Sequence, residues 1–481
     1  MRIAISIVIV VLFHGICLAL ESDVSIALDG YLSECHNRNL FHGTVLVAKD
    51  DSTVFCKGYG LADTVTGLPN GRDIKYRIGS ITKQFTTLII FQLAEEGKLR
   101  FDDRLETYIP EFRSDIASQV TVDHLLRHMS GIPSYTTEYF WQNYAQKPYT
   151  HEEFIAKFLG GKAISPPGEK YQYCNTNTYL LGVIIERVTG ESFEENLNKR
   201  LLKPLKLNNT RLDSDVENIE NRATNYMRCL GSFHDEPYVH VGNKLGTGGI
   251  LSTVDDLYAW LDAFSPGVIL SDSMITKIMT PYYRINRYYG YAYGWNIHSL
   301  RPRDGEQLVW VQTYNGHLYG AYASITYLYE ESIAIIITSN HDETVVSSDE
   351  IINILFDKPY QIPSVPPKDA FGIILDRHGL DSALSVYADV IERQPKYKRR
   401  SESDLNMVGY DLLRLDRKDE ARQIFEFILM TFPRSANAYD SFGEVLLAQG
   451  DTTNAIVNYK KSLRMNPANE NAQFMVNILT R

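Results

Sequence analysis

A serine and a lysine three residues apart are the first side chains in this sequence that could do chemistry together. Ser80 is the only serine of the chain that is followed by a lysine, Lys83, at that distance. On a helix, positions three apart lie on the same face, so the ammonium can reach the hydroxyl. A serine hydroxyl is a poor nucleophile until a base takes its proton, and a desolvated lysine can take part in that step. The pair therefore predicts nucleophilic catalysis at Ser80, although Ser-x-x-Lys also occurs by chance in a long chain.

The residues around this pair predict the helix that must position it. Gly79 precedes Ser80, and residues 81–93 are apolar almost all round, which is typical of a buried helix. The start of a helix carries unpaired N–H groups and the positive end of the helix dipole, and both stabilise a developing oxyanion. We therefore expect Ser80 at the N-terminus of a buried helix.

The chain has the composition of an ordinary globular protein. Its 481 residues are 44% hydrophobic and 22% charged, which is enough sequence for about two or three domains. The net charge is −11, and the longest basic run is Lys398-Arg399-Arg400. A chain with this charge is not expected to bind nucleic acid or anionic membrane surfaces.

Residues 1–19 have the layout of a secretory signal peptide, with a basic start, an apolar run over residues 3–13 and small residues near the expected cleavage site. The apolar run is too short to cross a bilayer. We therefore expect an exported protein, periplasmic or secreted, which contacts a membrane only if this segment stays uncleaved.

Four cysteines remain after such cleavage, and their spacings fit no zinc site. An even number in an oxidising compartment permits disulfides, with three pairings open. We favour Cys35 with Cys56 slightly, because the first helix and the first hairpin are expected to pack together; buried free thiols are the alternative. The others are Cys174 and Cys229.

The order of the predicted elements indicates an α/β fold in which both ends of one domain supply the sheet. An amphipathic helix is predicted over residues 23–33, followed by a hairpin from residues 43–48 and 53–56. Strands return over residues 322–338, whereas residues 120–265 are predicted to be helix and loop. Residues 20–357 are therefore expected to form a sandwich-like hydrolase domain with a helical insertion.

A proline-rich linker, residues 358–368, separates this domain from a helical region, residues 369–481. Four positions of that region recur after 34 residues, which resembles tetratricopeptide repeats, helix pairs that bury small and aromatic residues against their neighbours. The resemblance implies an all-α repeat domain that could bind a protein or peptide; a helical cap that only shields the catalytic domain is the alternative. The recurring pairs are Gly409 and Gly443, Ala421 and Ala455, Phe425 and Tyr459, and Pro433 and Pro467.

Four further stretches, in their order along the chain, resemble the serine β-lactamase and penicillin-binding-protein superfamily. They are residues 125–133, 167–175, 204–210 and 248–253, and the similarity extends over about residues 25–345. The branch that they resemble contains class C β-lactamases, D-alanyl-D-alanine carboxypeptidases and esterases. The resemblance implies a β-lactamase-like sandwich, an antiparallel sheet flanked by helices, and an acyl-enzyme mechanism.

This resemblance assigns roles to four side chains. Ser80 resembles the acylated nucleophile and Lys83 its partner, while Tyr173 and Asn175 match the Tyr-x-Asn motif of the family. A phenol near a lysine ionises more easily, so Tyr173 could accept the serine proton and later activate water. Whether Lys83 or Tyr173 is the formal base stays open, and Asn175 would either orient the substrate carbonyl or hold Lys83.

The third motif of the family, a lysine or histidine followed by a small residue and a glycine on an edge strand, is matched by Tyr314-Asn315-Gly316. These residues would bind substrate, and the N–H groups of Ser80 and His317 would form the oxyanion hole. A shifted alignment would use Gln312-Thr313-Tyr314 instead. Tyrosine in the cationic position departs from the family pattern and puts recognition of a substrate carboxylate in doubt.

Three other motif-like residues are interpreted as structural. Ser130 lacks a flanking base, Glu194 lies on a predicted solvated helix face, and His151 lacks the second histidine of a zinc-protease helix. No metal and no other cofactor is therefore implied.

The sequence thus predicts an exported serine hydrolase that acts through an acyl-enzyme on a small-molecule or peptide substrate. We expect a neutral ester, amide or peptide rather than efficient β-lactam hydrolysis. One alternative is a catalytically idle fold that binds peptides or assembles through its repeats, and another is a true β-lactamase or D-alanyl-D-alanine carboxypeptidase. Retention of Ser80, Lys83 and Tyr173 favours an enzyme, since an idle fold has no chemical reason to keep all three.

Overall fold

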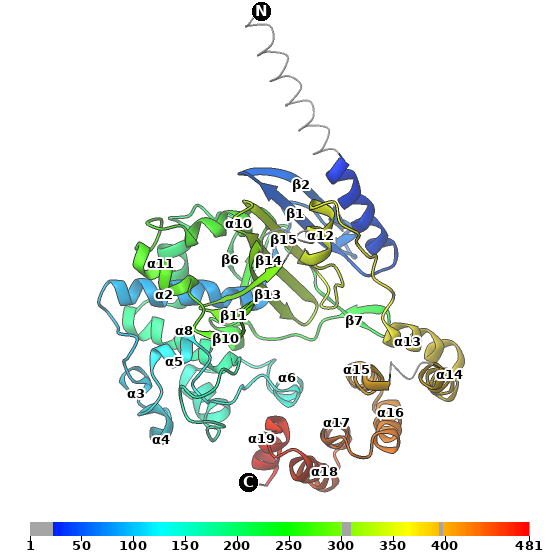
Figure 1. The fold of residues 1–481 in the computed structure, drawn as a ribbon. Coiled ribbons are helices and arrows are strands. Elements are labelled where there is room, and N and C mark those ends of the chain that lie inside the picture. The colour runs from blue at the N-terminus through cyan, green and yellow to red at the C-terminus, as the bar shows by residue number, and fades with distance from the viewer. Residues whose placement is uncertain (1–22, 301–308, 394–397, 481) are drawn as a thin grey trace, which may run out of the picture. The chain divides into compact units, whose positions relative to one another are not determined.

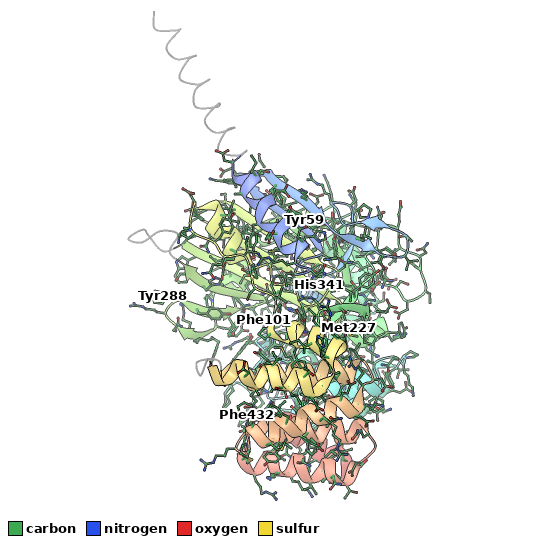
Figure 2. All side chains as sticks on the ribbon, turned by 90° about the vertical axis from the view of Figure 1, so that its right-hand side faces the viewer. Tyr59, Phe101, Met227, Tyr288, His341 and Phe432 are labelled. Atoms are coloured by element: carbon green, nitrogen blue, oxygen red, sulfur yellow. The ribbon has the colours of Figure 1, made fainter. Side chains whose placement is uncertain are left out.

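The structure is a computed structural model that describes residues 23–300, 309–393 and 398–480. The chain divides into two compact units, one containing the sheet and one made mainly of helices (Figure 1). The first comprises Met1–Met227 and Asp235–Pro363, and the second comprises Arg228–His234 and Ser364–Arg481. Met227, where the chain first leaves the first unit, is marked in Figure 2. The predicted signal peptide, residues 1–19, lies outside the described residues.

An eight-stranded antiparallel sheet forms the middle of the first unit. Both ends of the domain supply it, because β1 (Gly43–Lys49) pairs with β15 (Ile333–Ser339), with Val45 opposite Ile337. The predicted fold class, an antiparallel sheet flanked by helices and followed by an all-helical region, is therefore confirmed. In spatial order the strands are β10 (Tyr283–Asn286), β11 (Tyr289–Ala292), β12 (Trp295–Leu300), β13 (Val309–Leu318), β14 (Ala321–Leu328), β15, β1 and β2 (Ser52–Tyr59).

Helices cover both faces of this sheet, because its central strands are apolar on both sides (Figure 1). In β1, Val45 points to one face and Leu46 to the other, as the period of two in a strand requires. The helix of residues 23–37 and α12 (Ser348–Leu355) belong to the core on the first face. On the second face lies α2 (Thr82–Glu95), the predicted apolar helix after Ser80, which is buried over most of its length.

Between the two halves of the sheet, the chain forms the predicted helical insertion together with short strands that the sequence did not reveal. A small sheet of β5 (Tyr76–Arg77), β9 (Ile250–Ser252) and β6 (Arg211–Leu212) ties the segment before Ser80 to the end of this insertion. Strands of two or three residues are too short for an alternating pattern to show. The other elements are β3 (Leu61–Asp63), β4 (Leu68–Pro69), α3 (Leu105–Tyr108), α4 (Ser114–Ala117), α5 (Val122–Leu126), α6 (Glu138–Asn143), α7 (His151–Phe154), α8 (Asn175–Thr189), α9 (Phe193–Leu197), α10 (Val254–Ala259) and α11 (Asp272–Met279).

The second unit is a series of helices in which one packing contact recurs after 34 residues. A Cβ atom on Gly409 would lie 2.5 Å from the ring of Phe425, and one on Gly443 would lie 2.9 Å from the ring of Tyr459. Glycine is needed at both positions because an aromatic ring of the following helix occupies the place of a side chain. The helices are α13 (Pro367–His378), α14 (Leu380–Arg393), α15 (Lys398–Arg414), α16 (Lys418–Thr431), α17 (Ala436–Ala448), α18 (Thr452–Met465) and α19 (Glu470–Leu479).

The central part of a hairpin from far upstream in the chain, Arg228–His234, also belongs to this unit. Its strands are β7 (Tyr226–Cys229) and β8 (Ser232–Asp235), and Leu230 at the turn is buried in the same hydrophobic cluster as Phe371. The Leu230 N–H donates to Asp411 Oδ2 at 3.1 Å. The predicted repeat region, residues 369–481, did not include this hairpin.

The four cysteines of the described chain are free thiols. Cys35 lies in the core on one face of the sheet, whereas Cys56 packs against the core on the other face. The disulfide between Cys35 and Cys56 that the sequence favours is therefore absent. Among the described residues, no helix combines the length and the hydropathy that crossing a bilayer would require.

Candidate active site

Ser80 lies in a tight turn, Gly79–Ile81, which leads directly into α2. The Ile78 N–H donates to the carbonyl of Ile250 at 3.0 Å, which anchors this turn to the end of the insertion. Gly79 has a φ of +50°, and a Cβ atom there would lie 2.8 Å from the backbone nitrogen of His317. The turn therefore needs glycine for its left-handed conformation and for the close approach of β13.

Lys83 reaches Ser80 as its spacing predicted. The ammonium Nζ donates to Ser80 Oγ at 2.8 Å and to the carbonyl oxygen of Thr247 at 2.9 Å. Its side chain is only 2% exposed, so water does not compete for these bonds. The sequence did not single out Thr247 as a site residue, although the glycine-rich turn 246–249 around it was visible and marks a close backbone approach.

Tyr173 completes a connected set of three polar groups. Its phenol oxygen lies 2.7 Å from Ser80 Oγ, and its ring centroid lies 5.1 Å from Lys83 Nζ. Because Lys83 donates to Ser80 Oγ, the serine hydroxyl is free to donate its own proton to Tyr173. Tyr173 is 42% exposed, so this end of the set is open to a substrate from solvent.

His128 is a neighbour of Tyr173 that stays neutral. Its ring centroid lies 4.8 Å from that of Tyr173, and its Nδ1 accepts the backbone N–H of Cys174 at 3.3 Å. Burial, and then the positive charge of Lys83, lower the pKa of His128 to about 3. The ring therefore presents no acid that competes with Tyr173 at neutral pH.

Asn175 begins α8, two residues after Tyr173. Its Nδ2 donates to Thr136 Oγ1 at 2.9 Å, while Lys83 is held by Ser80 and Thr247. The Asn175 side chain therefore bonds to Thr136, and Lys83 is held by other groups.

The end of β13, which carries the third motif, lies against the turn Gly79–Ile81, which we call the nucleophile turn. The pairing of β13 with β12 stops at Thr313 opposite Asn296, while its pairing with β14 continues to Leu318. A Cβ atom on Gly316 would lie 1.9 Å from the carbonyl oxygen of Ile78 and 2.8 Å from the backbone nitrogen of Ser80. Asn315 Oδ1 accepts a hydrogen bond from Ser324 Oγ at 2.8 Å.

Tyr314 stands beside Tyr173 as a neutral phenol. It is 9% exposed, and burial, followed by the neighbouring phenols and its hydrogen bond to Tyr173, raises its pKa well above the usual value. The alternative cation His317 packs its ring against Tyr322, and burial lowers the pKa of this histidine, which favours its neutral form. Neither side chain supplies a positive charge to this end of the site at neutral pH.

The residues interpreted as structural have structural partners. Ser130 is 1% exposed, and its Oγ donates to Asn177 Oδ1 at 2.6 Å. His151 Nε2 lies 2.6 Å from Glu186 Oε2, which joins α7 to α8.

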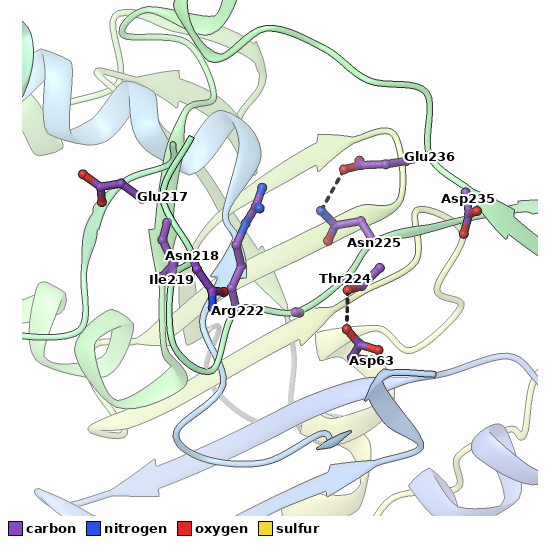
Figure 3. A pocket seen from close by; sticks show the side chains of 10 residues that line it. Asp63, Glu217, Asn218, Ile219, Arg222, Thr224, Asn225, Asp235 and Glu236 are labelled. Carbon is purple, nitrogen blue, oxygen red and sulfur yellow. Dashed lines mark hydrogen bonds between the residues drawn. The ribbon is translucent and has the colours of Figure 1, made fainter. Parts of the chain in front are cut away.

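A separate hollow of about 330 Å³ has an acidic lining that shares no residue with this site (Figure 3). Its side chains bond to one another, for example Thr224 to Asp63 at 2.9 Å and Asn225 to Glu236 at 3.3 Å. These hydrogen bonds engage polar groups of the lining with one another, and we assign this pocket no role in hydrolysis.

An antiparallel sheet with a helical insertion brings serine, lysine and tyrosine into contact at the start of a buried helix, an arrangement that fits a serine hydrolase. The chain belongs to the Beta-lactamase family, whose sequence model matches residues 34–355. A penicillin-binding protein is similar in sequence, and an amidohydrolase and a class C β-lactamase share the fold; this chain is accordingly an enzyme.

Three known proteins illustrate the similarity. Penicillin-binding protein 4* of Bacillus subtilis (strain 168) is 26% identical over 353 residues, which is 68% of this chain and 75% of that protein. The octameric penicillin-binding protein homologue from Pyrococcus abyssi is 28% identical, with a TM-score of 0.60 over 74% of this chain and 82% of that one. A D-stereospecific amidohydrolase from Streptomyces sp. shares the fold, with 23% identity and a TM-score of 0.57 over 70% and 98% of the two chains.

Proposed function

We propose that this protein is an exported hydrolase that forms an acyl-enzyme on Ser80 and prefers neutral ester, amide or peptide substrates. The observation that carries the proposal is the connected contact from Lys83 to Ser80 to Tyr173. Export rests on the signal-like pattern of residues 1–19. The D-stereospecific amidohydrolase with this fold and the penicillin-binding homologues are consistent with an amide or peptide substrate.

The reaction follows from the arrangement of these groups. Ser80 Oγ attacks the substrate carbonyl carbon while its proton passes to Tyr173 or Lys83, and the N–H groups of Ser80 and His317 bind the oxyanion. The bond from the carbonyl carbon to the leaving oxygen or nitrogen then breaks, and the leaving group takes the proton. Water attacks the acyl-enzyme by the reverse proton path and releases the acid.

The direct test is the intact mass of the protein after treatment with a fluorophosphonate and, separately, with a penicillin. We expect one fluorophosphonyl group on Ser80. The Ser80→Ala variant should stay folded and lose both labelling and turnover. Ser130→Ala is the matched control, since it removes a serine that bonds to Asn177, and it should still be labelled. Labelling at Ser130, or full turnover by Ser80→Ala, would overturn the assignment.

The preference for neutral substrates rests on Tyr314. A phenol offers an ordinary hydrogen bond of about 0.5–1.5 kcal/mol, whereas a lysine offers about 1.5–3 kcal/mol to a carboxylate. The exchange should weaken carboxylate recognition roughly tenfold and leave uncharged groups unaffected. We therefore expect a much higher kcat/KM on a neutral ester than on a carboxylated cephalosporin. Tyr314→Lys should raise activity on the cephalosporin, and efficient cephalosporin hydrolysis by the native enzyme would refute the preference.

A binding role for the helical unit is a second candidate, favoured by the contact that recurs after 34 residues. We propose that this unit consists of tetratricopeptide-like repeats that bind a protein or peptide. A pull-down tests this role, with the full native chain and a Gly443→Leu variant as baits and the captured protein or peptide as the readout. The leucine should displace the ring of Tyr459 and abolish capture while hydrolysis of a small ester continues; equal capture by both chains would argue against it.

A further inference from the structure

Three tyrosine rings are stacked beside the catalytic tyrosine. Tyr171, in the loop before α8, lies parallel to Tyr291 of β11, with centroids 4.2 Å apart and planes 10° apart. It also lies nearly parallel to Tyr283 of β10, at 5.4 Å and 18°. Tyr283 and Tyr291 are paired across the two strands, which fixes their spacing. We call Tyr171, Tyr283 and Tyr291 the tyrosine stack.

The tyrosine stack adjoins the reacting groups. Tyr171 precedes Tyr173 by two residues, and both rings contact His128, at 6.3 Å and 4.8 Å. Tyr171 and Tyr173 also both lie close enough to Tyr314 for their phenols to raise its pKa. One end of the stack is open, because Tyr283 is 38% exposed on the edge strand of the sheet.

The position of Tyr173 decides which part of a substrate meets the stack. In the proposed reaction the oxyanion binds the N–H groups of Ser80 and His317, where Gly79 and Gly316 bring residues 79–81 and β13 close together. Of the two groups that could take the serine proton, Tyr173 is the one exposed to solvent, and we assign it the transfer of that proton to the leaving group. The leaving group therefore departs on the side of Tyr173, toward the tyrosine stack.

We propose that the tyrosine stack is a specificity subsite that selects substrates with an aromatic leaving group, such as a benzyl alcohol, a benzylamine or an aromatic residue after the scissile bond. Parallel rings with an exposed member can accept one more ring in the same orientation, and aromatic pairs gain affinity beyond the apolar area that they bury. The inference rests on the proposed function, because it concerns the substrate of the same site.

The test compares two acetate esters with leaving groups of similar size and acidity, benzyl alcohol and cyclohexylmethanol. We expect the native enzyme to favour the benzyl ester in kcat/KM by about three- to tenfold. Tyr283→Leu, which keeps an apolar side chain but removes the exposed ring, should bring this ratio close to one, and Tyr283→Phe should restore it.

A matched control lies on the same hairpin. Tyr288, labelled in Figure 2, is 36% exposed, almost as much as Tyr283. Its ring centroid lies 4.4 Å from Cζ of Arg287, and Tyr288 is not a member of the tyrosine stack. Tyr288→Leu should leave the ratio unchanged. Hydrolysis of both esters at a ratio near one in the native enzyme, or equal effects of the two leucine variants, would refute the subsite and leave the proposed function standing. Failure to hydrolyse either ester, with no fluorophosphonate labelling of Ser80, would overturn both.

Discussion

At the scale of single residues, the contacts imply that Lys83, Ser80 and Tyr173 act as one unit. Lys83→Ala and Tyr173→Phe should each lower kcat/KM by about 10³-fold or more, and the double variant should lose little beyond either single change, because groups on one proton path are not additive. Steady-state kinetics on a neutral ester checks this expectation. Losses that multiply in the double variant would show that the two groups act separately.

A second residue-scale prediction concerns His128. Its pKa is lowered to about 3 in the folded protein, against about 6.5 in the unfolded chain, so the unfolded state takes up a proton first as the pH falls. His128 therefore contributes almost nothing to the pH dependence above about pH 7.5, and it lowers the free energy of unfolding progressively below that pH. Between pH 7 and pH 5 this loss should amount to about 2 kcal/mol.

The variant His128→Asn isolates this effect, because asparagine tolerates the left-handed conformation of residue 128, whose φ is +50°. Urea unfolding at pH 7 and pH 5 should show a smaller acid loss in the variant than in the native protein. Identical losses in the two proteins would contradict the burial of a neutral imidazole.

The sequence was sufficient to predict contacts that depend on local spacing. Lys83 reaches Ser80 because three residues on a helix make one turn, and that spacing is visible in the sequence. Thr247 was not predicted, because it acts through its carbonyl oxygen, a group that every residue has. Tyr171 was not distinguished from the other tyrosines, because its stacking partners come from strands more than 100 residues away.

Among the secondary-structure elements, the close approach of β13 to the nucleophile turn predicts that a larger side chain at residue 316 destabilises the protein. Gly316→Ala places a methyl group 1.9 Å from the carbonyl of Ile78, so backbone must move, and we expect a loss of about 3 kcal/mol or more together with loss of activity. Gly30 is the matched control: it is exposed within the helix of residues 23–37, with nothing within 4 Å of its Cβ position.

Gly30→Ala should instead raise stability by about 0.5–1 kcal/mol, because alanine has the higher helix propensity. Urea unfolding of the two variants and the native protein measures both effects. A harmless alanine at residue 316 would show that β13 does not pack closely on the turn.

The elements themselves could be predicted where a pattern was long enough. The buried run of β15 and the apolar length of α2 were visible in the sequence, because each is long enough for burial to show in composition. The sheet that joins β5, β9 and β6 was not, since its strands are two or three residues long and its partners lie far apart in the chain.

In the whole molecule, the hairpin of β7 and β8 determines which apolar surface becomes exposed when the helical repeats are removed. Leu230 is 3% exposed within the cluster that contains Phe371, and Lys368 Nζ lies 2.7 Å from Asp411 and 3.2 Å from the carbonyl of Arg228. A chain that ends at Tyr360 loses these partners. We expect it to fold its sheet and hydrolyse a small ester, but to bind a hydrophobic dye and aggregate.

Substituting Leu230→Ser in the shortened chain should reduce both dye binding and light scattering, because the substitution removes the exposed apolar turn. Equal aggregation with and without the serine would assign the defect to another surface. A shortened chain without esterase activity would show that the catalytic site itself depends on the helical unit.

The same hairpin also determines whether the two fragments stay associated after limited proteolysis. The linker over residues 358–366 has no regular structure, which makes it a natural cleavage site, and a single cut there separates the sequence into an amino-terminal and a carboxyl-terminal fragment. Residues 228–234 stay with the amino-terminal fragment in covalent terms but remain packed among the helices of the other. The two fragments should therefore elute together from a size-exclusion column in native buffer and separate only in denaturant. Cleavage of this linker should leave the two fragments of the enzyme associated.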